Sequence, residues 1–273
     1  MIVIESGGTK STWVFKSELG NIESIVTVGL HPQELFSQKQ KEIQALIDNQ
    51  NLAGETVYFY GAGCESAEAK TKIIFFLEKL GLKVNQVNTD IYAACLAHLG
   101  YEKGVVGILG TGAVAAEFDG EKIVRQTSGL GYILGDEGSG FDIGKRLLQK
   151  HFKGELSQEI NSAISVYFNH KSILHRIHEP DGRMIIAGLT KIVRQYITET
   201  AVNDILFEAF TDFGEKALRS IGKDFPVHFI GSVAFYFKEE LKEALLKSGF
   251  ETGGVKKEAV FEVFDFLSKN KDG

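Results

Sequence analysis

Cysteine, proline and long apolar runs are all scarce in this chain of 273 residues. Its two cysteines, Cys64 and Cys95, are too few and too far apart to build a zinc or iron–sulfur centre unaided, so we expect free thiols in a reducing compartment. The three prolines leave no proline-rich linker. No apolar stretch approaches the ~20 residues that cross a bilayer, so we expect a cytoplasmic protein without a membrane partner.

An excess of basic residues is also missing. The net charge is -6 and the isoelectric point is near 5.7, whereas a general nucleic-acid-binding protein needs a basic surface. Apolar residues make up 44% of the chain and charged residues 24%, which is an ordinary globular composition. The length suits one large domain or two modest ones.

Strands and a glycine turn dominate the first residues. An apolar run at 2–4 is followed by Gly7-Gly8, and 12–15 is apolar or β-branched. Residues 22–28 then alternate between two faces, and a period of two indicates a strand. We therefore predict a strand, a glycine turn, a strand, a turn and a third strand.

The same order recurs in the second half. Residues 105–109 are apolar, Gly110-Thr-Gly112 makes a glycine turn, and strands are predicted at 114–118 and 123–126. We interpret the repetition as a duplicated α/β domain. The predicted domains are 1–103 and 104–273. Packing of the last helix against the first domain is left open as an alternative.

The remaining elements are predicted from periodicity and glycine stops. Further strands are predicted at 57–60, 84–87 and 227–230. Helices are predicted near 32–49, 66–80, 90–99, 141–152, 155–168, 183–200, 203–221, 234–247 and 258–268.

Neither glycine turn is a P-loop or a dinucleotide fingerprint, because each is followed by a strand and has the wrong spacing. A hairpin turn can still point backbone N–H groups at phosphate oxygens, and glycine lets the phosphate approach closely. Thr9 or Thr111 could add a hydroxyl donor. A plain hairpin turn is the alternative, although two turns at equivalent places in a duplicated fold favour phosphate binding.

Three motifs carry a family resemblance. Glu5-x-Gly7-x-Thr9, Gly110-Thr-Gly112 and Gly231-Ser-Val233 resemble the two phosphate motifs and the adenosine motif of the actin–hexokinase–Hsp70 superfamily. Within it, the segment from Gly129 to Ser139 (GLGYILGDEGS) and Tyr60-Gly-Ala-Gly-Cys64 resemble N-acetylglucosamine kinases and the BadF/BadG/BcrA/BcrD ATPase family. The match runs through nearly the whole chain.

The resemblance implies two ribonuclease-H-like domains of the actin type, with ATP and Mg²⁺ in the cleft between them and a sugar-like small molecule as acceptor. It implies Asp90 as the catalytic base, although a helix cap or first-turn acid is the plainer interpretation of that residue. It places Glu5 near the metal. The phosphate and ATP contacts that it implies are Gly7, Gly8, Thr9, Lys10, Gly110, Thr111, Gly112, Gly231, Ser232 and Val233. The substrate contacts are His31, Ala113, Val114, Asp136 and Glu137.

Several of these positions depart from the family pattern. Glu5 stands where the family usually has Asp, and His31, Ala113 and Val114 stand where it has asparagine or serine. Fewer polar groups at a sugar site reduce discrimination for N-acetylglucosamine. His31 has a plainer interpretation as a surface residue, and Asp136 and Glu137 as an acidic turn before a helix that Ser139 caps.

Two functions remain open at this point. One is an ATP-dependent kinase of a sugar or amino sugar, and the other is a nucleotide-binding pseudokinase or sensor, which Glu5, Ala113 and Val114 favour. An activator of a radical dehydratase is disfavoured, because Cys64 and Cys95 do not fall at a suitable cluster motif. A homodimer is the one assembly that we consider, and no nucleic-acid partner is expected.

Overall fold

The computed structural model describes residues 1–7, 10–17, 19–35, 37–127 and 130–270. The chain forms two compact units, one made of Met1–Tyr101 with Ala259–Gly273 and the other of Glu102–Glu258. None of the helices in the described part of the chain has both the length and the apolar character that a bilayer span needs.

The first unit is built on a mixed five-stranded sheet. Its strand order is β3-β2-β1-β4-β5, with β1, β4 and β5 parallel and with β2 and β3 antiparallel to their neighbours. The strands are β1 (Ile2–Ser6), β2 (Lys10–Lys16), β3 (Ile22–Val28), β4 (Thr56–Gly61) and β5 (Lys83–Asn88). The helices are α1 (Ser37–Asn49), α2 (Ala67–Lys79), α3 (Asp90–Leu99) and α13 (Val260–Lys269).

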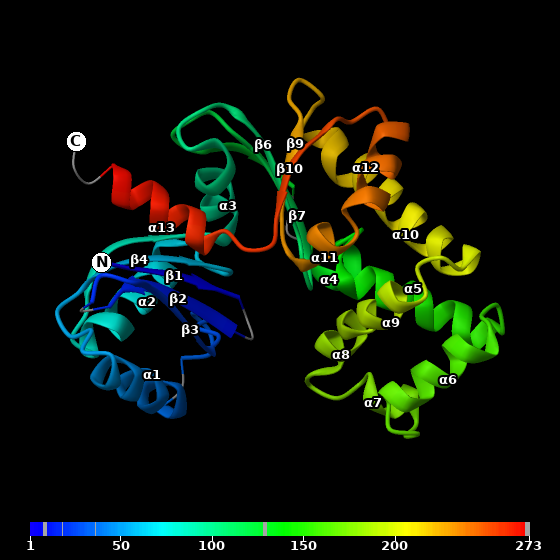
Figure 1. The fold of residues 1–273 in the computed structure, drawn as a ribbon, viewed down its shortest axis with the longest axis horizontal. Helices are drawn as coiled ribbons and strands as arrows, with labels where there is room; N and C mark the ends of the chain where they lie inside the picture. Colours follow the sequence, from blue (N-terminus) through cyan, green and yellow to red (C-terminus); the bar gives the residue numbers. More distant parts are fainter. Residues whose placement is uncertain (8–9, 18, 36, 128–129, 271–273) are drawn as a thin grey trace. The chain divides into compact units, whose positions relative to one another are not determined.

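Helices cover both faces of this sheet, with α1 and α2 on one side and α3 and α13 on the other (Figure 1). Successive side chains of a strand point to opposite faces. Ile2 and Ile4 of β1 accordingly join the core that α1 and α2 complete, whereas Val3 and Glu5 alternate with them. This alternation directs Glu5 toward the face that α13 covers.

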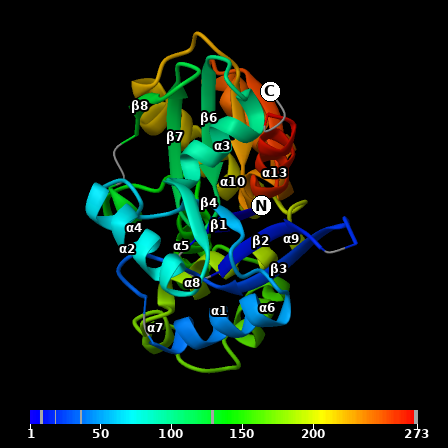
Figure 2. The ribbon, with the colours of Figure 1, turned by 90° about the vertical axis from the view of Figure 1, so that its left-hand side faces the viewer.

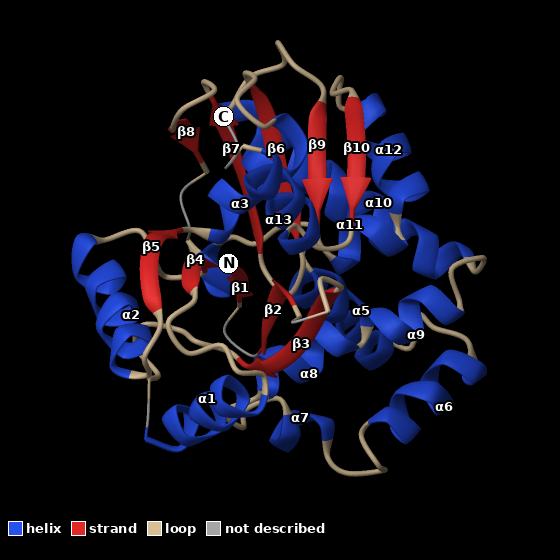
Figure 3. Ribbon diagram, turned by 60° about the vertical axis from the view of Figure 1, so that its left-hand side comes forward, coloured by secondary structure: helices blue, strands red, loops and turns tan. Residues whose placement is uncertain are grey.

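The second unit repeats this topology. Its strand order is β10-β9-β6-β7-β8, again with three parallel strands and two antiparallel ones beside them (Figure 3). The strands are β6 (Gly104–Leu109), β7 (Ala113–Phe118), β8 (Ile123–Gln126), β9 (Val227–Ile230) and β10 (Thr252–Lys256). Because both sheets follow one strand order, the predicted fold of two duplicated α/β domains is confirmed.

A helical insertion between β8 and β9 distinguishes the second unit (Figure 2). Its elements are α4 (Gly131–Leu134), α5 (Gly140–Lys153), α6 (Gln158–Tyr167), α7 (Ile173–Arg176), α8 (Gly182–Gly188), α9 (Thr190–Gln195), α10 (Thr200–Asp212), a π-helical turn η1 (Phe213–Ala217) and a 3₁₀ turn η2 (Leu218–Ser220). After β9 follow α11 (Ser232–Tyr236) and α12 (Lys238–Lys247).

Some predicted elements need correction. The predicted helix at 183–200 is two helices, α8 and α9. The segment predicted as a helix at 203–221 is α-helical to Asp212 and continues as a π-helical and then a 3₁₀ turn to Ser220. The helix predicted from residue 32 begins at Ser37. The strand β10 was missed because its sequence, TGGVK, contains two glycines and does not alternate, so only its pairing with β9 makes it a strand.

Candidate functional site

The carboxyl ends of the three parallel strands of the first unit carry the predicted groups. Gly7 follows β1, Ala62 to Glu65 follow β4, and Thr89-Asp90 follow β5. In open α/β sheets, ligands bind outside the carboxyl ends of the strands. The topology therefore brings the glycine turn and Asp90 to the same edge of one sheet.

The first glycine turn is anchored by two buried serines. The N–H of Gly7 donates to the carbonyl of Lys10 at 2.9 Å, which closes the hairpin. Ser11 Oγ donates to Ser6 Oγ at 2.8 Å, and both hydroxyl oxygens accept from the N–H of Leu30, at 3.2 and 2.8 Å. Sequence reasoning missed this pair, because a serine in a strand carries no signal until its partner is known. Gly8 and Thr9, which we predict as phosphate contacts, lie outside the described residues.

Asp90 is the first residue of α3, and Thr89 is the residue that caps this helix. Thr89 Oγ1 accepts from the N–H of Tyr92 at 3.3 Å, and Asp90 Oδ1 accepts from the N–H of Ile91 at 2.9 Å. Burial raises the pKa of Asp90 to about 6, the hydrogen bond from Ile91 opposes the shift, and the charge of Glu65 adds to it. A carboxylate with a pKa near neutrality is suited to general-base work.

His31 is half-buried and packs on Gly63, so the plain interpretation as a surface residue does not describe it. A Cβ on Gly63, whose φ is +80°, would lie 2.5 Å from His31 Nε2. His31 Nδ1 accepts from the N–H of Gln33 at 3.3 Å, which leaves the proton of the neutral ring on Nε2. The ring is therefore oriented at the turn that follows β4.

Glu5 reaches the first turn of α13. Its Oε2 accepts from the N–H of Ala259 at 3.1 Å and from that of Val260 at 2.9 Å. The N-cap residue of α13 is Ala259, which has no side-chain oxygen. The Glu5 carboxylate of β1 therefore caps the helix by accepting hydrogen bonds from its first N–H groups. An aspartate would be one methylene too short to make both bonds in this position.

The resemblance implies a magnesium ion beside Glu5, and the described residues do not fit such a role well. The Glu5 carboxylate is engaged by two helix N–H groups, and no cluster of three or more His, Cys, Asp or Glu side chains within the described ranges could hold a metal. The metal role of Glu5 stays a prediction, and no step is built on it.

The cap assignment predicts an order of stability among Glu5 variants. Glu5→Ala should lower the free energy of unfolding by about 1–2 kcal/mol, because two helix N–H groups lose their acceptor. Glu5→Gln keeps an acceptor oxygen and should lose only about 0.3–1 kcal/mol, the interaction of the charge with the helix dipole. Glu5→Asp should lose about as much free energy of unfolding as Glu5→Ala, because the shorter side chain holds its carboxylate too far from the two helix N–H groups. Urea unfolding measures these differences.

Glu78→Gln, an exposed change on α2, serves as the control for loss of an acidic charge. An aspartate variant as stable as the wild type, or more stable, would contradict the cap assignment.

In the second unit the glycine turn and the Gly231 motif pack together. Gly231 has φ +120°, and a Cβ there would lie 2.3 Å from the carbonyl oxygen of Leu109 and 3.3 Å from the amide nitrogen of Gly110. The carbonyls of Gly110 and Thr111 accept from Gly140 at 2.7 Å and Phe141 at 3.3 Å. The turn is thus held by β9 and by the start of α5.

The other side chains that we predict as ligand contacts in the second unit range from buried to exposed. Ala113 and Val114 are half-buried at the start of β7, paired with Leu109 and Ile108. Thr111 and Ser232 are exposed. Val233 is buried in the hydrophobic core, so its side chain supports the motif from within.

The acidic pair Asp136 and Glu137 lies beside the same turn. Asp136 adopts φ +60°, a left-handed conformation that costs a non-glycine residue about 1 kcal/mol or more. A Cβ on Gly112 would lie 3.0 Å from Asp136 Oδ2. Ser139 caps α5 by accepting from the N–H of Asp142 at 3.2 Å, as predicted for a cap at this place.

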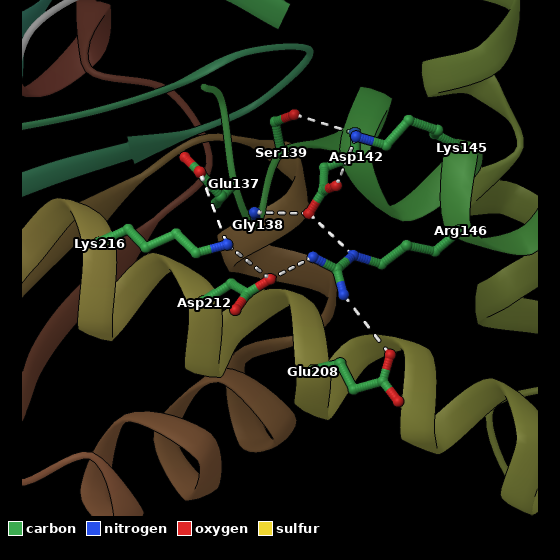
Figure 4. A network of polar contacts seen from close by, with 9 residues as sticks. All are labelled: Glu137, Gly138, Ser139, Asp142, Lys145, Arg146, Glu208, Asp212 and Lys216. Carbon is green, nitrogen blue, oxygen red and sulfur yellow. Dashed lines mark hydrogen bonds and ion pairs between the residues drawn. The ribbon is translucent and has the colours of Figure 1, made fainter. Parts of the chain in front are cut away.

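An ionic network fixes the backbone that carries this pair (Figure 4). Asp142 is 3% exposed, and its Oδ2 accepts from the N–H of Gly138 at 3.2 Å and from Arg146 Nε at 3.1 Å. Arg146 Nη2 also donates to Asp212 at 2.5 Å. Lys216 Nζ lies 3.2 Å from Asp212 and 3.9 Å from Glu137.

Asp212 shows the electrostatic balance of this network. Partial burial acts to raise the pKa of Asp212, but the hydrogen bonds and charges of Arg146 and Lys216 outweigh it and lower the pKa. Sequence reasoning missed Arg146, Asp212 and Lys216, because Asp212 and Lys216 lie far along the chain from the acidic pair and Arg146 gave no signal without them.

Known proteins resemble this chain in sequence and in fold. No protein-family model matches the chain. An N-acetylmuramic acid/N-acetylglucosamine kinase from Clostridium acetobutylicum is 25% identical over 215 residues, which is 71% of this chain and 69% of that protein.

Solved structures extend the match over the whole chain. A candidate N-acetylglucosamine kinase from Porphyromonas gingivalis has 30% sequence identity and a TM-score of 0.85, and the match covers 99% of each chain. A ROK family glucokinase from Streptomyces griseus, solved with glucose and AMPPNP, shares the fold with 16% identity and a TM-score of 0.62, over 97% of this chain and 98% of that one. The chain therefore belongs to the N-acetylglucosamine kinase-like family of actin-type ATPases, as its motifs predict.

Proposed function

We propose that this protein transfers the terminal phosphoryl group of ATP to a hydroxyl group of an amino sugar. The names of its relatives suggest N-acetylglucosamine or N-acetylmuramic acid as the acceptor. The observation that carries the proposal is Asp90, a half-buried carboxylate with a pKa of about 6 at the ligand-binding edge of its sheet, in a chain of this family.

In the proposed reaction Asp90 accepts the proton of the attacking hydroxyl as its oxygen bonds to the terminal phosphorus of ATP. The bond between that phosphorus and the bridging oxygen breaks, and ADP leaves with the bridging oxygen. Such transfer depends on positioning and on neutralisation of charge more than on covalent chemistry. The N–H groups of Gly7 and Gly110 close their own turns, to the carbonyls of Lys10 and Gly112. The backbone donors proposed to hold phosphate oxygens are therefore the N–H groups of Thr111 and Gly112.

The remaining residues have proposed roles at the same ends of the sheets. Asp136 and Glu137 would accept hydrogen bonds from sugar hydroxyls, and His31 would donate through Nε2. Magnesium is proposed to enter with ATP, where phosphate oxygens and water supply most of its ligands. A homodimer and a cytoplasmic location stay predictions.

The test is ADP formation by purified protein supplied with ATP and Mg²⁺ across a panel of sugars and amino sugars. We expect turnover with an N-acetylated amino sugar and little with unrelated hexoses. ATP binding without turnover on any member of the panel would contradict the kinase and favour the pseudokinase. Nothing in the comparisons favours that alternative.

A further inference from the structure

Arg183 lies against the second glycine turn, although neither the motifs nor the proposed reaction assigns it a role. It is the second residue of α8, and its Nη2 donates to Asp136 Oδ2 at 2.9 Å. A Cβ on Gly112 would lie 2.9 Å from the same Nη2 atom. The lack of a side chain at 112 therefore leaves room for the guanidinium beside the turn.

The guanidinium is held in one orientation by its neighbours. Its Cζ lies 5.1 Å from the ring centroid of Tyr132, which is a cation–π distance. Tyr132 packs edge-to-face on Phe141 with ring centroids 4.9 Å apart, and the N–H of Phe141 donates to the carbonyl of Thr111. The turn and the arginine thus rest on the same residue of α5.

The arginine keeps donors available at this turn. An arginine presents five N–H donors in a planar fork that matches an oxyanion, and in the described part of the chain Asp136 engages Nη2 alone. The Arg183 side chain is 41% exposed, whereas that of Asp136 is 8% exposed. The buried carboxylate orients the fork, and the arginine side chain stays partly open to solvent.

We propose that Arg183 recognises an oxyanion at the Gly110-Thr-Gly112 turn. The oxyanion comes from one of two sources, the terminal phosphate of the nucleotide or an acidic substituent of the sugar acceptor. Both use the same chemistry, charge-assisted hydrogen bonds from a guanidinium. The inference rests on the proposed function for the identity of these ligands, but its test uses equilibrium binding and needs no turnover.

The experiment compares Arg183→Met and Arg183→Lys with the wild type, and uses Arg219→Met as the matched control on the exposed turn η2. Calorimetry measures two pairs of probes. AMPPNP and ADP differ by the terminal phosphate, and N-acetylmuramic acid and N-acetylglucosamine differ by an acidic substituent. In one of the two pairs, we expect Arg183→Met to weaken binding of the member with the additional anionic group (AMPPNP or N-acetylmuramic acid) about 10- to 100-fold, and binding of its partner less than threefold. Arg183→Lys should give an intermediate loss.

The binding results distinguish the two candidate sources of the oxyanion, the nucleotide and the acceptor. A loss confined to AMPPNP assigns Arg183 to the nucleotide, and a loss confined to N-acetylmuramic acid assigns it to the acceptor. Equal losses within both pairs would show that Arg183 only supports Asp136, and unchanged binding of all four probes would also overturn the proposal. Failure of the proposed kinase appears elsewhere, as a wild-type protein that forms no ADP.

Discussion

Asp90→Asn is expected to reduce phosphoryl transfer by about 10²- to 10⁴-fold, because the amide cannot accept the proton of the acceptor hydroxyl. Binding of nucleotide should change little. The side chain that replaces the carboxylate keeps an oxygen for the N–H of Ile91, so α3 should keep its first turn. Single-turnover assays with the preferred sugar, together with calorimetry of the nucleotide, measure the two effects separately.

The raised pKa of Asp90 predicts the direction in which activity and stability change with pH. The wild-type base works only when ionised, so kcat/KM should rise with pH through about 6 and level off above it. The pKa of Asp90 is raised on folding, so the stability that its protonated form contributes is complete below the unfolded pKa, near 3.9, and is lost as the pH rises through about 6. Asp90→Asn should therefore raise Tm above pH 6 and match the wild type near pH 3.

Glu65→Gln is the matched variant for this argument. The charge of Glu65 contributes to the raised pKa of Asp90, so its removal should move the acidic limb of the activity profile to lower pH and leave the plateau rate nearly unchanged. An Asp90→Asn protein with more than a tenth of wild-type activity, or an acidic limb that Glu65→Gln does not move, would argue against Asp90 as the base.

Arg146→Met is expected to lower the free energy of unfolding by about 2–3 kcal/mol, the largest stability change that we predict. Arg146 is the shared partner of Asp142, which is 3% exposed, and of Asp212. Without Arg146, the buried Asp142 carboxylate keeps Lys145 at 3.2 Å and the N–H of Gly138, and Asp212 keeps Lys216 at 3.2 Å. A buried charge that loses one of its partners is compensated less well, and this destabilises the fold. Methionine keeps most of the apolar stem of arginine, so the loss reports the charge. Urea unfolding monitored by circular dichroism measures it.

Two further variants make this test specific. Arg176→Met breaks ion pairs with Asp181 and Glu179 near the surface and should cost about 1 kcal/mol or less. The double variant Arg146→Met with Asp142→Asn should recover part of the loss, because the buried charge is gone. A single Arg146→Met change that costs no more than Arg176→Met would show that the network in Figure 4 contributes little.

Local patterns were sufficient for most strands and for both glycine turns. The alternation of residues 22–28 and the apolar run before Gly110 predicted β3 and β6, because strand formation there follows side-chain period over a few residues. The repeated order of strands and turns then predicted two related sheets. The motif residues predicted the family as well, and the comparisons confirm it.

Contacts between residues far apart in the sequence decided the rest. The strand β10 exists because β9 supplies its hydrogen bonds, and its own glycines gave no signal. Asp142 and Arg146 lie four residues apart on α5, but Asp212 reaches Arg146 only after α5 and α10 pack together, so spacing along the chain could not reveal this part of the network.

Glu5 shows most clearly the difference between what the local sequence determines and what the tertiary structure determines. The sequence by itself determined that a carboxylate lies near the end of β1 beside a glycine turn, and the family resemblance implied that it is a metal ligand. Only the tertiary structure placed the N–H groups of Ala259 and Val260 on its Oε2 atom, across 254 residues of chain in the first case. Strand period and turn chemistry act over a few neighbouring residues, whereas the partner of a buried carboxylate is set by which distant helix returns to cover that face of the sheet.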